Sequence, residues 1–248
     1  MTAAAVALTA VLAALAIAFA PRRAAANVAA LRRDLETDPR ARERFYGRAI
    51  LSIPLVVALY AVVVLAGGGS WRDAGLSWDR DASRLAVPTS IAALAAALAA
   101  VALVALVVGA LRPGAIERAN EATKVIAPAT PRERRLWLLV SLSAGVTEEL
   151  VYRGLFVLHL NALVPSLRPG PLAVLAALAF GIAHRYQGPF GVVSSAILGL
   201  AFGIVAIVVG NVLVVVALHT LWDVVAGFVK REVGDAGTAE QGRPAEAP

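Results

Sequence analysis

The sequence predicts an all-α fold: a bundle of about seven transmembrane helices, with the N-terminus outside and the C-terminus inside the cell. Three observations support this fold class. Hydrophobic residues make up 59% of the 248 residues, and the mean hydropathy is +0.75. Several apolar runs reach the roughly 20 residues that cross a bilayer as a helix. The Lys and Arg residues lie between these runs, as expected for a multi-pass membrane protein.

The first three predicted helices cover residues of about 3–20, 49–67 and 85–111. The first run ends in Ala18-Phe19-Ala20, as a secretory signal does before its cleavage site. Its positive charges follow the run instead of preceding it, and Pro21 comes directly after it, so we expect a retained span. Three glycines from Gly67 onward end the second span.

The last four predicted helices cover residues of about 136–164, 171–186, 190–208 and 211–229. The fourth run is apolar enough for one long helix although it contains ionisable residues. In the sixth, Gly199 and Gly203 form a small-xxx-small pattern that we expect to pack helices within one chain. A tail rich in Gly, Ala, Pro and Glu follows the seventh, and we expect it to be disordered and cytoplasmic.

The distribution of positive charge sets the predicted orientation. With the N-terminus outside, 18 of the 23 Lys and Arg residues fall in cytoplasmic segments and 4 fall in outer loops, while Arg153 lies within a span. This asymmetry follows the positive-inside rule. The net charge of +6 therefore reflects orientation, and we expect no nucleic-acid partner.

The chain divides into three predicted parts. Residues 1–135 hold three transmembrane helices with basic cytoplasmic loops, residues 136–229 hold a core of four helices, and residues 230–248 form the tail. The spans and short loops leave no stretch long enough for a separate soluble domain.

The first polar motif lies in the fourth span, where Glu148 and Glu149 are followed by Arg153. Ionisable groups within a bilayer cost at least about 2.5 kcal/mol each, so such residues indicate a functional site. Glu149 and Arg153 are four residues apart and share a helix face, which predicts a buried ion pair. Glu148 projects about 100° away, and we expect it to be free to take up and release a proton.

Two further motifs carry histidine. His184 ends the fifth span, four residues after Phe180, and His219 lies four residues before Asp223 on the seventh. That spacing suits a carboxylate that orients an imidazole, or two ligands that share one metal ion. Because isolated polar groups in separate spans would each need their own partners, we expect all three motifs to meet in one polar cavity.

The chain contains no Cys, which excludes thiolate nucleophiles and Cys-ligated zinc, so histidines and carboxylates must carry the chemistry. Such groups can carry out a hydrolysis, which needs an activated water, a base and donors for the developing oxyanion. Glu148 is the predicted base with His184 as its partner. The alternative is a zinc-bound hydroxide, with ligands drawn from Glu148, His184, His219 and Asp223.

The order of these motifs resembles the CPBP intramembrane proteases, the group that includes the type II CAAX prenyl endopeptidases and bacteriocin-processing or bacteriocin-immunity proteins. The resemblance covers roughly residues 136–228. It implies that Glu148 and His184 activate a water, that Glu149 and Arg153 support the site, and that His219 with position 223 stabilises the oxyanion. This chain carries Asp223 where the prenyl endopeptidases carry Asn. A carboxylate donates no hydrogen bond unless it is protonated, so we expect that Asp223 orients His219 or that it binds a metal.

The predicted function is therefore an intramembrane endopeptidase that hydrolyses a membrane-associated peptide or protein. A non-catalytic immunity or regulatory membrane protein is the alternative, and a proton-coupled transporter is a third reading of buried carboxylates and histidines. Transporters are often built from inverted repeats and broken helices, which the sequence does not display. The bias toward Ala, Arg and Val suggests a GC-rich bacterial genome, so we expect a multi-pass protein of the bacterial plasma membrane. The sequence predicts neither the oligomeric state nor the cleaved bond.

Overall fold

The computed structural model describes residues 22–66, residue 76, scattered residues between 88 and 110, residue 121 and residues 123–241. Every regular element in this part of the chain is a helix, which confirms the all-α prediction. The predicted first span, 3–20, much of the third, 85–111, and the glycines that follow the second span lie outside the described residues. Two described helical stretches are long and apolar enough to cross a membrane, Ala41–Val62 and Arg185–Val209, and two shorter apolar helices are Pro169–Ala183 and Val212–Phe228.

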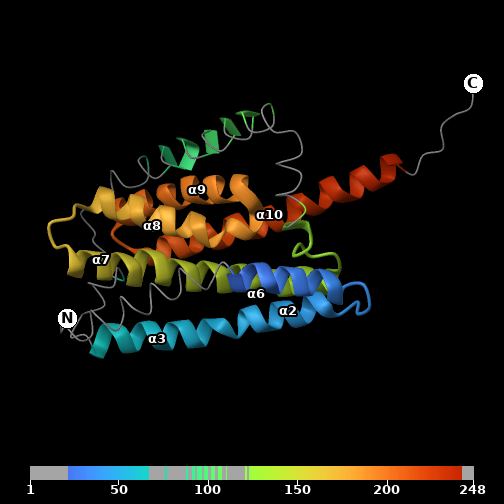
Figure 1. Ribbon diagram of the computed structural model, residues 1–248, viewed down its shortest axis with the longest axis horizontal. Helices are drawn as coiled ribbons and strands as arrows, with labels where there is room; N and C mark the ends of the chain where they lie inside the picture. The colour runs from blue at the N-terminus through green and yellow to red at the C-terminus, as the bar shows by residue number, and fades with distance from the viewer. Residues whose placement is uncertain are drawn as a thin grey trace, which may run out of the picture.

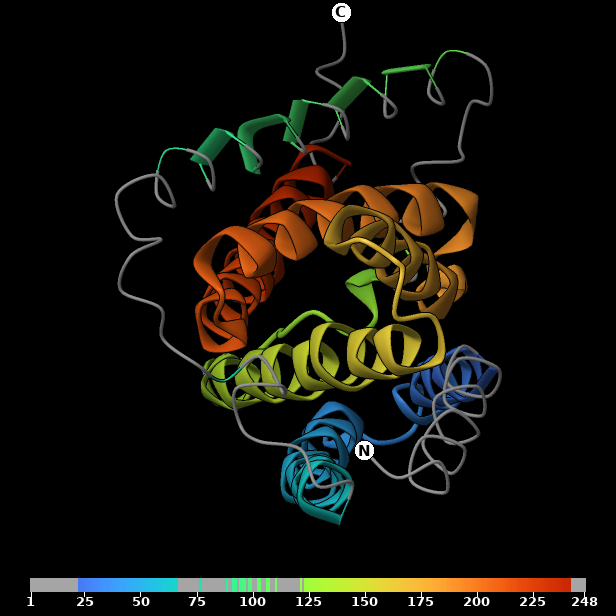
Figure 2. The same cartoon turned by 90° about the vertical axis from the view of Figure 1, so that its left-hand side faces the viewer.

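The helices pack as a bundle of long, roughly parallel and antiparallel rods (Figure 1). Helices α2 (Ala41–Ile50) and α3 (Ser52–Ala66) lie along one side of α6 (Pro131–Glu149). On the other side are α8 (Pro169–Ala183), α9 (Gly188–Val209) and α10 (Val212–Gln241). Figure 2 shows α6, α8, α9 and α10 around one interior, with α2 and α3 outside it. The helices that carry the three polar motifs, α6, α8 and α10, therefore surround the same interior.

A capping box starts α6 five residues earlier than the sequence predicted. The Thr130 hydroxyl accepts a hydrogen bond from the Glu133 backbone N–H, and the Glu133 carboxylate accepts one from the Thr130 N–H, while Pro131 occupies the first turn. This arrangement satisfies backbone donors that the first turn of a helix leaves without partners. Glu133 is 2% exposed and lies 3.8 Å from Arg42, so the start of α6 is also tied to α2.

The predicted single helix 136–164 is interrupted by a π-helix. Residues Leu150–Phe156 have the wider π geometry between α6 and α7 (Val157–Leu163). The π-helix contains Arg153 and Gly154, both buried. A Cβ at Gly154 would lie 2.5 Å from the Tyr60 ring, so the glycine permits close contact with α3. Short π segments inside α-helices are frequent at functional sites.

Small residues bring α8 and α9 together. A Cβ added at Gly199 would lie 3.0 Å from the Phe180 ring and 3.1 Å from the Arg153 guanidinium, and one at Gly203 would lie 3.1 Å from Ala173. This confirms that the small-xxx-small pattern packs helices within the chain. The close approach also lets the Gly199 carbonyl reach Arg153 across the interface.

The last helix is longer than predicted. We expected it to end at about residue 229 and to be followed by a disordered tail, 230–248, but α10 continues to Gln241. The predicted boundary is therefore wrong, and the helix projects beyond the bundle toward the C-terminus (Figure 1). The predicted helix ended too early because this stretch has little apolar periodicity. The charged and Ala residues between Lys230 and Gln241 are nevertheless compatible with a helix.

Candidate active site

Glu149 and Arg153 form the buried ion pair that their spacing predicts. Arg153 Nη1 donates to Glu149 Oε1 at 2.9 Å, and the two side chains are 3% and 0% exposed. Arg153 Nη2 also donates to the Gly199 carbonyl at 2.8 Å, and its guanidinium lies 4.7 Å from the centre of the Phe180 ring. A hydrogen-bonded partner for each charge is the condition under which a buried pair is tolerated. Arg153 therefore fixes Glu149 and joins the π-helix to α9.

His219 shares the carboxylate of Glu149. Its Nδ1 lies 2.7 Å from Glu149 Oε1, the oxygen that also accepts from Arg153. Because an ionised carboxylate can only accept, Nδ1 carries the proton and Nε2 faces the other way. The sequence predicted that Asp223 either orients His219 or binds a metal. In the structure Nδ1 of His219 contacts Glu149, and Asp223 Oδ2 lies 3.7 Å from Nε2. The 70 residues between Glu149 and His219 left no local signal from which this pair could be predicted.

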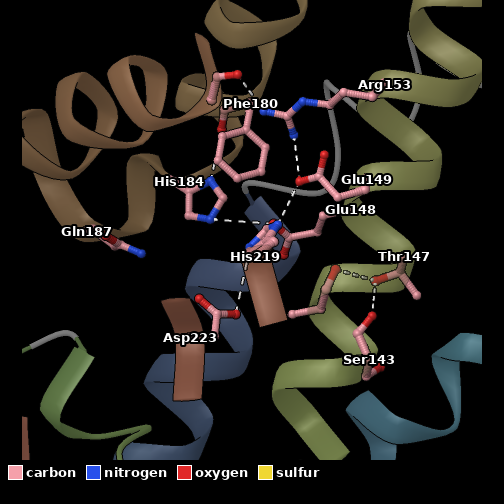
Figure 3. A network of polar contacts seen from close by, with 12 residues as sticks. Ser143, Thr147, Glu148, Glu149, Arg153, Phe180, His184, Gln187, His219 and Asp223 are labelled. Atoms are coloured by element: carbon pink, nitrogen blue, oxygen red, sulfur yellow. Dashed lines mark hydrogen bonds and ion pairs between the residues drawn. The ribbon is translucent and has the colours of Figure 1, made fainter. Parts of the chain in front are cut away.

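Glu148 lies where the two histidines meet (Figure 3). Its Oε2 is 3.8 Å from His184 Nε2 and 3.9 Å from His219 Nε2. This oxygen is buried and has no hydrogen-bond partner among the described residues, although the side chain as a whole is 32% exposed. The prediction that the three motifs share one cluster is confirmed. The Glu148 side chain is therefore partly accessible to solvent, and one of its carboxylate oxygens faces two imidazole nitrogens.

The end of α8 determines the orientation of His184. Its Nδ1 lies 2.9 Å from the Phe180 carbonyl oxygen, one helical turn earlier. A carbonyl only accepts, so Nδ1 carries the proton and Nε2 is directed at Glu148. The chain then makes a single 3-10 turn, η2 (Arg185–Gln187), and enters α9 through Gly188 at φ +78°. The positive φ at Gly188 favours glycine and allows this sharp reversal.

Asp223 lies at the open side of the cluster. Its Oδ2 is 3.7 Å from His219 Nε2, and its side chain is 28% exposed. Trp137 Nε1 donates to the Asp223 backbone carbonyl at 3.1 Å and thereby ties this turn of α10 to α6. The sequence did not predict this role of Trp137. A lone Trp near the start of a span carries no signal that distinguishes it from an interfacial residue.

Two aromatic side chains line the cluster. The Phe180 ring lies 4.5 Å from the His184 ring and 5.2 Å from the Tyr152 ring, measured between centroids. The Tyr152 ring, four residues after Glu148, packs edge-on against Phe180. Phe180 thus packs against both the His184 imidazole and the Arg153 guanidinium and helps to hold them in place.

The cluster was tested for a metal site because its donor set, imidazole nitrogens and carboxylate oxygens, is one that zinc uses. Within the described part of the chain, no group of three or more His, Cys, Asp or Glu side chains is placed to hold one ion. His219 Nδ1 is already engaged with Glu149. The side chains as they are placed therefore do not fit a metal site. The zinc alternative stays a prediction that metal analysis can test.

The sequence model of one protein family matches residues 131–225, and that family is described as "Type II CAAX prenyl endopeptidase Rce1-like". Residues 131–225 belong to the Rce1-like family. No curated protein and no solved structure matches the chain. The Rce1-like segment begins with the first residue of α6. It includes all of the predicted site residues: Glu148, Glu149, Arg153, His184, His219 and Asp223.

The match confirms the predicted family. The Rce1-like family is a membrane protease family, which supports peptidase activity on a peptide or protein substrate in a membrane. The Rce1-like segment ends two residues after Asp223, so it contains the complete cluster, all of α6, α8 and α9, and the first part of α10. The helices that precede residue 131 are outside it.

Proposed function

We propose that this chain is an intramembrane endopeptidase in which Glu148 activates the water that hydrolyses a peptide bond. The observation that carries the proposal is the buried Oε2 of Glu148, which lacks a hydrogen-bond partner among the described residues and faces the Nε2 atoms of His184 and His219. Such a carboxylate can bind and deprotonate a water held between it and the imidazoles. A positioned general base contributes about 10²- to 10⁴-fold to a rate.

The proposed reaction balances protons within the cluster. Glu148 removes a proton from the water, and the resulting hydroxide attacks the carbonyl carbon of the scissile peptide bond. The carbonyl oxygen becomes an oxyanion. Glu148 then delivers its proton to the amide nitrogen, the C–N bond breaks, and a carboxylic acid and an amine leave. No covalent intermediate with the enzyme is required.

His219 is placed to stabilise the oxyanion. When its ring carries both protons, Nε2 donates into the cluster, while Nδ1 stays bonded to Glu149. Glu149 compensates the positive charge of the ring, and Arg153 holds that carboxylate in place. A preorganised donor of this kind acts without reorientation during the reaction, which is the main advantage of an oxyanion hole.

The outer surface of the bundle supports a site within a membrane. Large apolar side chains are exposed on the helices that surround the cluster. Examples are Leu139 on α6, Leu178 and Ile182 on α8, and Leu221 on α10, which are between 47% and 59% exposed. Exposed apolar surface on this scale is a liability in water and is suited to lipid. The site is therefore proposed to act on a peptide bond near the membrane.

The decisive test of the function is cleavage of a peptide library by the purified protein in detergent micelles, with inhibitors of serine and cysteine proteases present. We expect cleavage that persists after treatment with a chelator, and no stoichiometric metal in the protein. No cleavage of any peptide would favour a non-catalytic immunity or regulatory role. Activity that is lost with the chelator and restored by zinc would favour the metal mechanism.

Asp223→Asn should retain the activity of the native protein or raise it. The amide keeps the shape of the carboxylate near His219 and adds N–H donors at the oxyanion. The backbone contact of Asp223 with Trp137 does not involve the side chain, so folding should be unaffected. Activity is to be measured with and without a chelator. If Asp223 is a metal ligand or orients His219, the same substitution should reduce activity about 10- to 100-fold.

Asp223→Ala is the control for this experiment because it removes the carboxylate without adding a donor. It should be less active than Asp223→Asn. Full activity of Asp223→Ala would show that this side chain takes no part in the reaction.

We also propose that the protein is a multi-pass protein of the bacterial plasma membrane with its C-terminus inside. A reporter fused after Arg231 should be cytoplasmic, and one fused near Asp73, which lies outside the described residues, should be external. The charge asymmetry of 18 to 4 favours this orientation. The measurement is the activity of compartment-specific reporters, and the reverse pattern would contradict both the number of spans and their direction.

A further inference from the structure

A second cavity lies next to the catalytic cluster. Its volume is about 510 Å³, and it runs between the helical segment 22–34 and the turn that follows α8. The segment contributes Val28, Arg32 and Arg33, and the opposite wall contains Glu121 and Tyr186. We call this cavity the arginine groove. Most of its lining lies outside residues 131–225, the part that matches the Rce1-like family.

The arginine groove is next to the proposed active site, and a contact between two aromatic rings links them. The Tyr186 ring lies 6.0 Å from the His184 ring between centroids, and His184 Nε2 lies 3.8 Å from Glu148. An extended peptide advances about 3.3 Å per residue. A peptide whose scissile bond lies at Glu148 therefore reaches Tyr186 within a few residues.

The groove has an excess of positive charge. Arg32 and Arg33 are exposed, and neither guanidinium has an ion-pair or hydrogen-bond partner among the described residues. Glu121 contributes a single negative charge to the lining. Leu31, the neighbouring residue, is 1% exposed, so the segment that carries the two arginines is packed against the protein. Exposed guanidinium groups on such a packed segment can bind carboxylates through paired charge-assisted hydrogen bonds.

We propose that the arginine groove binds a carboxylate of the peptide substrate a few residues from the scissile bond, and so selects acidic substrates. The proposal rests on the proposed endopeptidase function. The carboxylate comes from an acidic side chain or from the end of the substrate chain, since both offer the same chemistry. Specificity for this group would then be set by residues that precede the family segment.

The test measures binding separately from cleavage. Fluorescent peptides of one length are prepared with Asp or Asn a few residues from the cleaved bond, each with a free carboxyl terminus or a carboxamide. Their Kd is measured in detergent on the Glu148→Gln protein, which is expected not to cleave them. Their KM and kcat are measured on the protein with Glu148 intact. If the protein with Glu148 intact cleaves none of the peptides, the proposed function is contradicted. The proposal for the groove is tested separately, by the Kd values.

Arg32→Gln combined with Arg33→Gln should weaken binding of the acidic peptide on the order of 10-fold, because charge-assisted hydrogen bonds are lost. The Kd of the neutral carboxamide peptide should not change. KM should follow Kd, and kcat should stay the same. Added salt should weaken binding of the acidic peptide to the native groove, since the contact is electrostatic and near the surface.

The matched control is Arg134→Gln with Arg135→Gln. These two exposed arginines lie on the first turns of α6 and do not line the groove. Their loss removes the same charge from a predicted cytoplasmic segment and should leave the preference for acidic peptides unchanged.

Three results would overturn the proposal. The first is that the double variant of Arg32 and Arg33 weakens the binding of all peptides equally, which would indicate a structural role for these residues. The second is that this variant still prefers acidic peptides, which would place the carboxylate-binding site elsewhere. The third is that the double substitution, in protein held in nanodiscs, changes the affinity for vesicles of anionic lipid and leaves the affinity for peptides unchanged. That result would make the groove a binding site for lipid headgroups.

Discussion

Glu148→Gln is expected to abolish proteolysis while leaving the protein folded and inserted. Gln has the shape of Glu but cannot accept the proton from water, so the loss should appear in kcat and reach about 10²- to 10⁴-fold or more. Glu148 Oε2 has no hydrogen-bond partner among the described residues, so its replacement by an amide of the same shape breaks no hydrogen bond of this oxygen and should leave the packing of the helices intact. The measurements are peptide cleavage and thermal unfolding in the same detergent.

Glu43→Gln is the matched control for that substitution. Glu43 lies on α2, where it pairs with the exposed Arg132 at 3.2 Å, far along the chain from the cluster. The variant carries the same chemical change and should cleave peptides at the native rate. Native-like cleavage by Glu148→Gln would remove Glu148 from the mechanism, whatever the control shows.

Glu149→Ala should cause the largest loss of stability. The native carboxylate is 0% exposed and accepts hydrogen bonds from both Arg153 and His219. Its removal leaves the Arg153 charge in a low-dielectric interior and frees His219, at a cost of about 3 kcal/mol or more in the free energy of unfolding. The measurement is unfolding of the purified protein in mixed detergent micelles. A midpoint equal to that of the native protein would show that the pair does not hold the bundle together.

The double variant Glu149→Leu with Arg153→Met separates stability from function. Replacement of both charges by apolar side chains leaves no uncompensated buried charge, so much of the lost stability should return. Activity should stay low, because His219 has lost the carboxylate that fixes the proton on Nδ1. Recovery of activity together with stability would show that Glu149 serves only to neutralise Arg153.

The sequence was sufficient to predict local relationships. The four-residue spacing of Glu149 and Arg153 predicted their ion pair, and the cost of isolated polar groups in apolar helices predicted that Glu148, His184 and His219 would meet. Both inferences depend on helix periodicity and on burial, which a single sequence contains. The same reasoning gave the glycine packing between α8 and α9.

Relationships between distant segments could not be predicted in this way. The bond from His219 to Glu149 depends on how α6 and α10 are rotated against each other, and periodicity leaves that rotation undetermined. Asp223, four residues from His219, was the nearer candidate in sequence. Trp137 was missed for the same reason, since its partner is a backbone carbonyl on another helix. The length of α10 was missed because its final turns have little apolar pattern.

The π-helix limits how far the function of this chain can be transferred to other proteins on the basis of a short motif. Hydrogen bonds from residue i to i+5 take up extra residues per turn, so Leu150–Phe156 gives α7 a direction that a regular helix would not. The Glu-Glu-x-x-x-Arg string ends at Arg153, before those wide turns are complete. A chain of slightly different length just after the Arg would keep the string and rotate everything beyond it, by about 100° for each residue gained or lost. Comparisons that aim to transfer function should therefore align the whole stretch to Leu163, insertions included, and not the string alone.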